Sequence, residues 1–267
     1  MHRRMSIPNL SATLIISAAV ALGAGIGVTP IRLPGAALDP SLQNEADRAV
    51  RQSAAWIASR QNPDGSWGVS NHVSLTSLAL LSLSASRQPG FSEATTRAVL
   101  WLDAHATNRV ADLGAHAWRL LALAQALPAT GARPAVLRRF AEAGRPFEAN
   151  APADVRRLWR ESLAAAGLEA PPLPAHDASS RVASVAAAWP PAPTSTATLW
   201  QLAHFINREA NGQLLRDNTP LDWRRDLAQR LVNTQRSASS GGGYWEAPEA
   251  DATLAETAFG LLSLLEL

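Results

Sequence analysis

Hydrophobic residues recur at intervals of three and four along most of this chain, which is the period of an α-helix with one buried face. Polar turns rich in glycine, proline or asparagine separate these segments. The segments 74–86 and 112–127 are apolar on nearly every side, as is typical of helices buried on most of their surface. The predicted helices are 44–60, 74–86, one that begins at Ser92, 112–127, 135–143, 153–166, 179–188, 194–209, one that begins at Thr219, and 252–267.

Several helix ends carry capping signals. Ser92 can cap the helix that follows it, and Asn211-Gly212 can end the helix before it. Thr219 stands at a cap position, with Pro220 at the first helical position and Asp222 three residues after the cap. No long alternation of polar and apolar residues predicts a β-strand, so the chain is predicted to be all-α, with about five helix pairs.

One short motif occurs at two distant places, as QNPDGSWG (61–68) and as QRSASSGGGYWE (235–246). In both, a glutamine ends a helix, a polar turn follows, a tryptophan closes the turn, and an apolar helix begins soon after. The spacing between Trp67 and Trp245 equals about four units of roughly 44 residues, the length of a helix-pair repeat. The pattern favours stacked helix pairs arranged as an α/α toroid or an open arc, with the more apolar helices inside.

These motifs resemble the QW-type repeats of the terpenoid cyclase and prenyltransferase α/α-toroid superfamily. The chain is most similar to the short, exported, squalene-cyclase-like repeat proteins of bacteria, over 45–106 and 194–267. The resemblance implies that each glutamine side chain bonds backbone groups at its turn and at a neighbouring helix, while the tryptophan packs over the junction. The structural motif residues that it implies are Gln61, Asp64, Gly65, Trp67, Gln235, Gly243 and Trp245.

The N-terminal region 1–37 is predicted to be an export signal or a membrane anchor. Arg3 and Arg4 precede the uncharged stretch Leu10–Val28, which fits a secretory leader and is also long enough to span a bilayer. Residues 38–267 are predicted to form the repeat domain. The expected location is therefore outside the cytoplasm, either periplasmic or anchored to the inner membrane, and membrane contact is expected only through the N-terminal segment.

Charge and cysteine content exclude two classes of partner or site. Of 24 basic residues, Arg3, Arg4 and Arg32 precede Leu38, whereas all 22 acidic residues follow it, so the repeat domain is close to neutral. This balance gives no support for nucleic-acid binding. The chain has no cysteine, so it has no disulfide and lacks the Asp/Cys/His zinc set of the protein prenyltransferase branch. No metal and no cofactor is predicted.

Known catalytic motifs of the resembled superfamily are missing. Neither D-x-D-D nor D-D-x-x-D occurs, and the acidic group Glu246, Glu249 and Asp251 is spread over a turn and is interpreted as solvated charge. The histidines are scattered singly. Sugar lyases on related α/α rings use Tyr, His, Asn and Arg, and Tyr244 is the single tyrosine of the chain.

The favoured hypothesis is therefore a non-catalytic binding or scaffold domain for an apolar small molecule or a protein partner, although enzyme activity is left open. The alternatives are a terpenoid cyclase or prenyltransferase-like enzyme that acts on an isoprenoid and, less favoured, a polysaccharide-lyase-like enzyme. Tryptophan at helical spacing is more often core, yet several aromatic side chains are candidates to line a ligand surface. The candidate ligand-lining residues are Trp56, Trp118, Trp200, Trp223 and Tyr244.

Overall fold

The computed structural model describes residues 37–105, 112–127, 133–170, 178–192, 194–239 and 241–267. Within these ranges the chain forms ten α-helices, which confirms the all-α prediction. They are α2 (Pro40–Ser59), α3 (His72–Ser86), α4 (Ser92–Ala104), α5 (Leu113–Ala126), α6 (Arg133–Gly144), α7 (Ala153–Ala165), α8 (Ala178–Ala187), α9 (Thr196–Glu209), α10 (Trp223–Thr234) and α11 (Ala250–Leu265). Two 3₁₀ turns, η1 (Pro89–Phe91) and η2 (Arg145–Phe147), precede α4 and follow α6.

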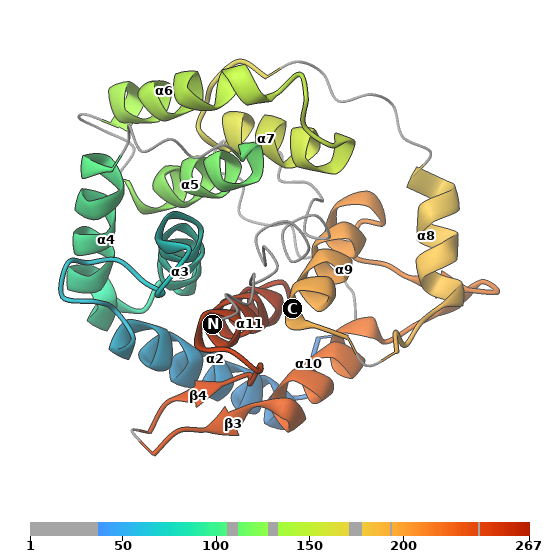
Figure 1. Cartoon of the computed structure of the whole chain (residues 1–267). Helices are drawn as coiled ribbons and strands as arrows, with labels where there is room; N and C mark the ends of the chain where they lie inside the picture. The colour runs from blue at the N-terminus through green and yellow to red at the C-terminus, as the bar shows by residue number, and fades with distance from the viewer. Residues whose placement is uncertain (1–36, 106–111, 128–132, 171–177, 193, 240) are drawn as a thin grey trace, which may run out of the picture.

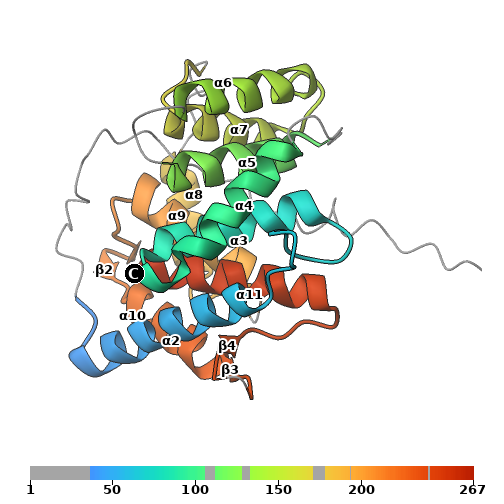
Figure 2. The same cartoon turned by 90° about the vertical axis from the view of Figure 1, so that its left-hand side faces the viewer.

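The helices form two layers, with the odd-numbered helices inside and the even-numbered helices outside (Figure 1). Turning the molecule shows the same division, with α11 running between α2 and the other inner helices (Figure 2). The division follows the sequence pattern, because α3, α5 and α11 are buried over most of their residues, as the apolar segments predict. The alternation of outer and inner helices agrees with the predicted stack of helix pairs.

The inner helices pack as the series α7, α5, α3, α11 and α9. The first and last helices that the structure describes, α2 and α11, also pack directly on each other. At the two ends of the inner series, Arg157 of α7 and Glu209 of α9 form an ion pair, with Nη2 and Oε1 2.5 Å apart. The choice between a toroid and an open arc stays a prediction.

One predicted helix start, at Thr219, and one predicted cap, at Ser92, are wrong. Thr219 and Pro220 do not begin a helix; they form strand β2 (Thr219–Pro220), which pairs antiparallel with β1 (Leu215–Arg216). The turn between the strands holds Asp217 and Asn218 at φ 50° and 62°, the left-handed pair that a tight hairpin requires. Helix α10 starts after this hairpin, and its cap is Asp222, whose Oδ1 accepts the N–H of Arg225.

The predicted cap at Ser92 is also wrong. The cap position of α4 is held by Phe91, with no side-chain hydrogen bond, because the 3₁₀ turn η1 runs directly into the helix. Helix α2 begins earlier than predicted, since the carboxylate of Asp39 accepts the N–H groups of Ser41 and Leu42. The predicted end at Asn211-Gly212 agrees with the left-handed backbone of both residues.

No helix among the described residues combines the length and the apolar character needed to cross a bilayer. The stretch Leu10–Val28, on which the predicted leader depends, lies outside the described residues.

Candidate ligand-binding site

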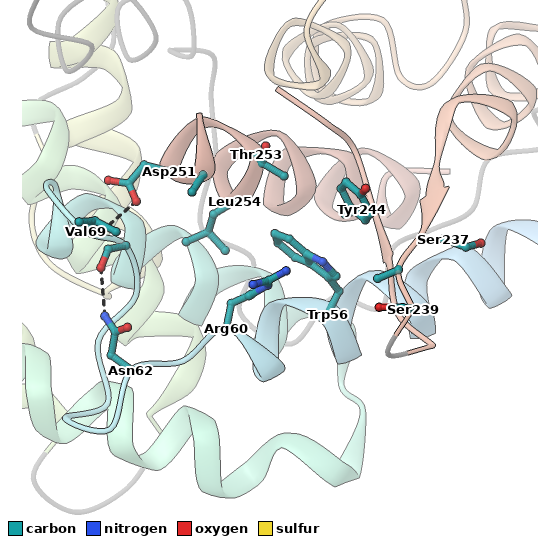
Figure 3. Close-up of a pocket in the computed structure, with 13 residues that line it drawn as sticks. Trp56, Arg60, Asn62, Val69, Ser237, Ser239, Tyr244, Asp251, Thr253 and Leu254 are labelled. Atoms are coloured by element: carbon teal, nitrogen blue, oxygen red, sulfur yellow. Dashed lines mark hydrogen bonds between the residues drawn. The ribbon is translucent and has the colours of Figure 1, made fainter. Parts of the chain in front are cut away.

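A pocket of about 560 Å³ opens at one edge of the molecule, between the end of α2, the turn before α3, a hairpin and the start of α11. The hairpin consists of β3 (Arg236–Ser237) paired antiparallel with β4 (Gly243–Tyr244). Figure 3 shows the residues of these four segments that line the pocket, with Trp56, Arg60 and Leu254 near its centre. The pocket is lined by Trp56, Arg60, Asn62, Gly68, Val69, Ser237, Ala238, Ser239, Tyr244, Ala250, Asp251, Thr253 and Leu254.

Two aromatic rings form one wall of this pocket. Trp56 of α2 and Tyr244 of β4 are stacked, with ring centroids 5.5 Å apart and planes inclined by 17°. The guanidinium carbon of Arg60 lies 5.1 Å from the centre of the Trp56 ring, and Trp56 lies between Arg60 and Tyr244 in Figure 3. Trp56 is 5% exposed, and its buried Nε1 has no hydrogen-bond partner among the described residues. This wall is therefore aromatic, with a cation at one end.

The opposite edge is held by Asp251 at the start of α11. Its carboxylate accepts the N–H of Val69 at 2.8 Å, the N–H of Ser70 at 3.0 Å and the hydroxyl of Ser70 at 2.8 Å. Asp251 therefore does not fit the prediction that it is merely solvated charge, because it ties the turn before α3 to α11. Val69 itself is 78% exposed at the pocket edge, the largest exposure among the exposed large hydrophobic residues.

The hairpin reaches this position because glycine lets it lie against α2. A Cβ on Gly242 would come within 2.8 Å of the Cβ of Trp56, so a larger residue would push the hairpin away. Gln235, just before β3, donates from Nε2 to the carbonyl of Ala49 and to the hydroxyl of Ser53 on α2. The pocket wall thus depends on one of the predicted structural glutamines.

The first glutamine–tryptophan corner follows α2. Gln61 Nε2 donates to the carbonyl oxygen of Gly65 at 3.0 Å and to that of Ala94 on α4 at 2.8 Å. The indole of Trp67 is fully buried and donates to the carbonyl of Ile57 at 2.7 Å. Gln61 therefore bonds both its own turn and the next outer helix.

The second corner follows α10 and repeats these contacts in part, because Gln235 Nε2 makes both of its hydrogen bonds to α2 and, among the described residues, none to its own turn. Gln235 bonds the next outer helix in space, α2, and the buried indole of Trp245 donates to the carbonyl of Leu231 at 3.1 Å. In each corner the accepting carbonyl lies four residues before the glutamine, at Ile57 or at Leu231. The two distant motifs thus occupy equivalent places between outer helices.

The remaining motif residues lie at the same corners. Asp64 accepts the N–H and hydroxyl of Ser66 and the indole N–H of Trp101, and these hydrogen bonds, that of the Ser66 hydroxyl most of all, lower the pKa of Asp64. Gly65 has φ +93°, a left-handed conformation that favours glycine. At Gly243 an added Cβ would lie 2.6 Å from Cδ of Gln235.

Three of the five candidate ligand-lining residues do not line the pocket. Trp118 and Trp200 pack in the interior with Phe259, at centroid distances of 5.5 to 5.7 Å. Trp223 is 2% exposed and donates its indole N–H to the carbonyl of Gly212. Trp56 and Tyr244 are the two candidates that the structure brings together at the pocket.

Most of the polar lining of the pocket was not predicted from the sequence. Arg60, Asn62, Ser237 and Ser239 come from two segments far apart in the chain, and no spacing indicates that they face one another. The sequence feature that could have indicated these residues is their position in or beside the two corner motifs, because the corners bring α2 and the hairpin together.

The described lining of the pocket contains only part of the side-chain sets that the predicted enzyme alternatives use. Its described lining contains one carboxylate, Asp251, whereas an acid of the cyclase type requires neighbouring carboxyl groups. Tyr244 and Arg60 both line it, but no histidine does, so the set expected for a lyase is incomplete. Within the described ranges, no three His, Cys, Asp or Glu side chains are grouped in a way that could hold a metal ion.

A second polar cluster joins the inner helices and has no counterpart in the sequence analysis. His204 of α9 contacts Glu266 through Nδ1 and Oε1 2.7 Å apart, and Asn207 donates to the other carboxylate oxygen at 2.9 Å. Burial raises the pKa of Glu266, but the hydrogen bonds and charges of His204, with help from Asn207 and Arg208, outweigh it and hold the pKa below its usual value. This cluster fixes the last residues of the chain against α9.

Comparisons of the chain with protein-family models, with curated proteins and with solved structures give no match.

Proposed function

We propose that this chain is a non-catalytic binding domain that holds a small ligand with an apolar part in the pocket beside Trp56 and Tyr244. Export through residues 1–37 and membership of the squalene-cyclase-like repeat proteins are parts of the same proposal, and they depend on the sequence pattern alone.

The stacked Trp56–Tyr244 wall is the observation that carries the proposal. Aromatic surface beside a few polar groups is the usual composition of small-molecule sites, and the pocket volume of about 560 Å³ lies within their ordinary range. Buried Leu254 continues this wall, and exposed Val69 stands at its edge. A ligand with an apolar part would remove this surface from water, which is the main favourable term in such binding.

The arrangement favours binding over catalysis because the acidic group in the pocket is already engaged. The three hydrogen bonds to Asp251 engage both of its carboxylate oxygens in holding the turn before α3 to α11, so the carboxylate acts as a structural link. None of the histidines that the structure describes lines the pocket, and His204 belongs to the separate cluster with Glu266.

Binding can be tested on the purified full chain with Nile red, an uncharged dye that fluoresces in apolar surroundings. We expect saturable binding that Ser239→Trp abolishes, because Ser239 is exposed at the pocket and a large ring there would fill it. Ser92→Trp, also exposed but outside the pocket, is the matched control. Equal binding to all three proteins, or no saturable binding to the unmodified chain, would disprove the assignment.

A further inference from the structure

The two charged side chains of the pocket differ in whether another group compensates their charge. Arg60 and Asp251 are the two charged residues of its described lining. Asp251 accepts three hydrogen bonds from the turn before α3, so its charge is compensated by fixed N–H and O–H dipoles. Arg60 has no carboxylate within ion-pair distance in the part of the chain that the structure describes, and its guanidinium lies over the ring of Trp56. The pocket therefore offers one uncompensated positive charge.

The neighbouring polar atoms add further donors. The hydroxyls of Ser237, Ser239 and Tyr244 form no hydrogen bond with other described residues and are able to donate. The Nε1–H of Trp56, which is donor only, is buried without a partner in a side chain that is 95% covered. A buried N–H without an acceptor is unfavourable, so a bound acceptor beside Trp56 would remove a cost that the unliganded site carries.

The apolar atoms lie next to these donors. Leu254 is buried, the Tyr244 ring is partly covered, and Val69 is 78% exposed at the edge. A fully polar ligand such as free phosphate would leave this surface in contact with water or with a polar group. The lining thus combines a donor-rich, positively charged end with an apolar side.

We propose that the ligand of this pocket is a small anionic amphiphile: an apolar body that carries a carboxylate or phosphate group, with that group bound by Arg60. This inference depends on the proposed binding function and specifies its ligand class. Arg60 provides a planar set of donors suited to either oxyanion, and the guanidinium is held by the Trp56 ring in a position from which it can reach the pocket. A fatty acid and a phosphorylated lipid share this chemistry.

The proposal can be tested by displacing Nile red from the full chain with four probes below their micelle concentrations. Decanoate and decyl phosphate have the anionic group and the apolar body, decanol has the body alone, and inorganic phosphate has the charge alone. We expect at least one of the two anionic amphiphiles to displace the dye at a concentration about tenfold lower than decanol, because a charge-assisted hydrogen bond is worth at least that factor. Which of the two is stronger identifies the headgroup.

Variants on α2 show whether Arg60 causes the preference. Arg60→Met keeps an apolar stem and removes the charge. In this variant we expect the anionic amphiphiles and decanol to displace the dye at about equal concentrations, because the charge-assisted hydrogen bond is lost. Arg51→Met removes an exposed charge from the same helix outside the pocket and should keep the preference. Arg60→Lys keeps the charge and should retain part of it.

The outcomes separate this inference from the function on which it depends. If decanol displaces the dye as well as both anions do, or if Arg60→Met leaves the preference unchanged, the anionic ligand class is wrong while the binding site stands. If inorganic phosphate alone displaces the dye as well as decyl phosphate does, the amphiphile is wrong. If Nile red does not bind, the proposed function itself is wrong.

Discussion

Thr76 on α3 and Thr257 on α11 accept equivalent hydrogen bonds at the two glutamine–tryptophan corners. Thr76 Oγ1 accepts the backbone N–H of Trp67 at 2.9 Å, and Thr257 Oγ1 accepts that of Trp245 at 3.2 Å. Both threonines are fully buried. Each corner is therefore fixed twice, by the indole to the outer helix before it and by the backbone to the inner helix after it.

This relationship predicts a stability loss for Thr76→Val, which keeps the shape of the side chain but removes the acceptor. The buried N–H of Trp67 would lose its partner, at a cost of about 1–3 kcal/mol in the free energy of unfolding. Urea unfolding followed by circular dichroism measures the change. Thr76→Ser keeps the hydroxyl and should recover most of the loss, and Thr219→Val, at an exposed strand, should have little effect. Equal stability of Thr76→Val and the unmodified chain would contradict the assignment.

The contact between Gly243 and Gln235 predicts a coupled pair. Gly243→Ala would place a Cβ 2.6 Å from Gln235 Cδ, so the glutamine would have to leave its bonds to Ala49 and Ser53, and we expect a loss of about 1–3 kcal/mol. In a Gln235→Ala background the same change should cost much less, because the clash is gone. A double-mutant cycle by denaturant unfolding measures the coupling, and strict additivity would show that the two residues do not interact.

At Gly260 in α11 we expect substitution by alanine to lower stability, although helix propensity alone predicts an increase. Alanine in a helix interior is ordinarily more stable than glycine by about 1 kcal/mol. At Gly260, however, the new Cβ would lie 2.5 Å from the buried ring of Trp245, so we expect Gly260→Ala to lower the melting temperature. Gly90→Ala, where nothing lies within 4 Å, is the control and should be neutral or slightly stabilising. A higher melting temperature for Gly260→Ala would mean that the ring moves aside.

The cluster of Glu266 and His204 predicts that the folded chain loses part of its stability in acid. The pKa of Glu266 is lowered in the folded chain, so its contribution to stability is present above the unfolded value and is lost as the pH falls through the folded value. Glu266→Gln should therefore be less stable than the unmodified chain at neutral pH, with a smaller difference in acid. Unfolding midpoints in urea at pH about 7 and about 3, on either side of the ordinary glutamate pKa, measure this. Glu45→Gln, at an exposed position of α2, should show no such convergence.

Helical periodicity predicts most of the fold because it reports burial directly. The apolar segments 74–86 and 112–127 correspond to the buried helices α3 and α5. The start at Thr219 was wrong for a local reason: Pro220 fits the first turn of a helix and an exposed strand equally well, and the hairpin turn at Asp217-Asn218 decided between them.

The candidate site was less predictable because its residues meet only through the packing of distant elements. Trp56 and Tyr244 could be proposed as aromatic candidates, but Trp118 and Trp200 have the same composition signal and lie in the interior. The role of Asp251 depends on two backbone N–H groups at Val69 and Ser70, which no side-chain pattern encodes. Pocket residues of this kind become visible only when the first and last described helices, α2 and α11, are placed together.

The packing of α11 on both α2 and α3 also bears on the order in which the chain can fold. During synthesis, α2 and α3 leave the ribosome long before α11. Their apolar faces that pack on α11 therefore stay exposed until this last described helix is made. Contacts between such distant segments slow folding and leave surface open to association in the meantime. The pocket beside Trp56 and Tyr244 is lined by residues of both α2 and α11, so it can form only after α11 has been synthesised and packed.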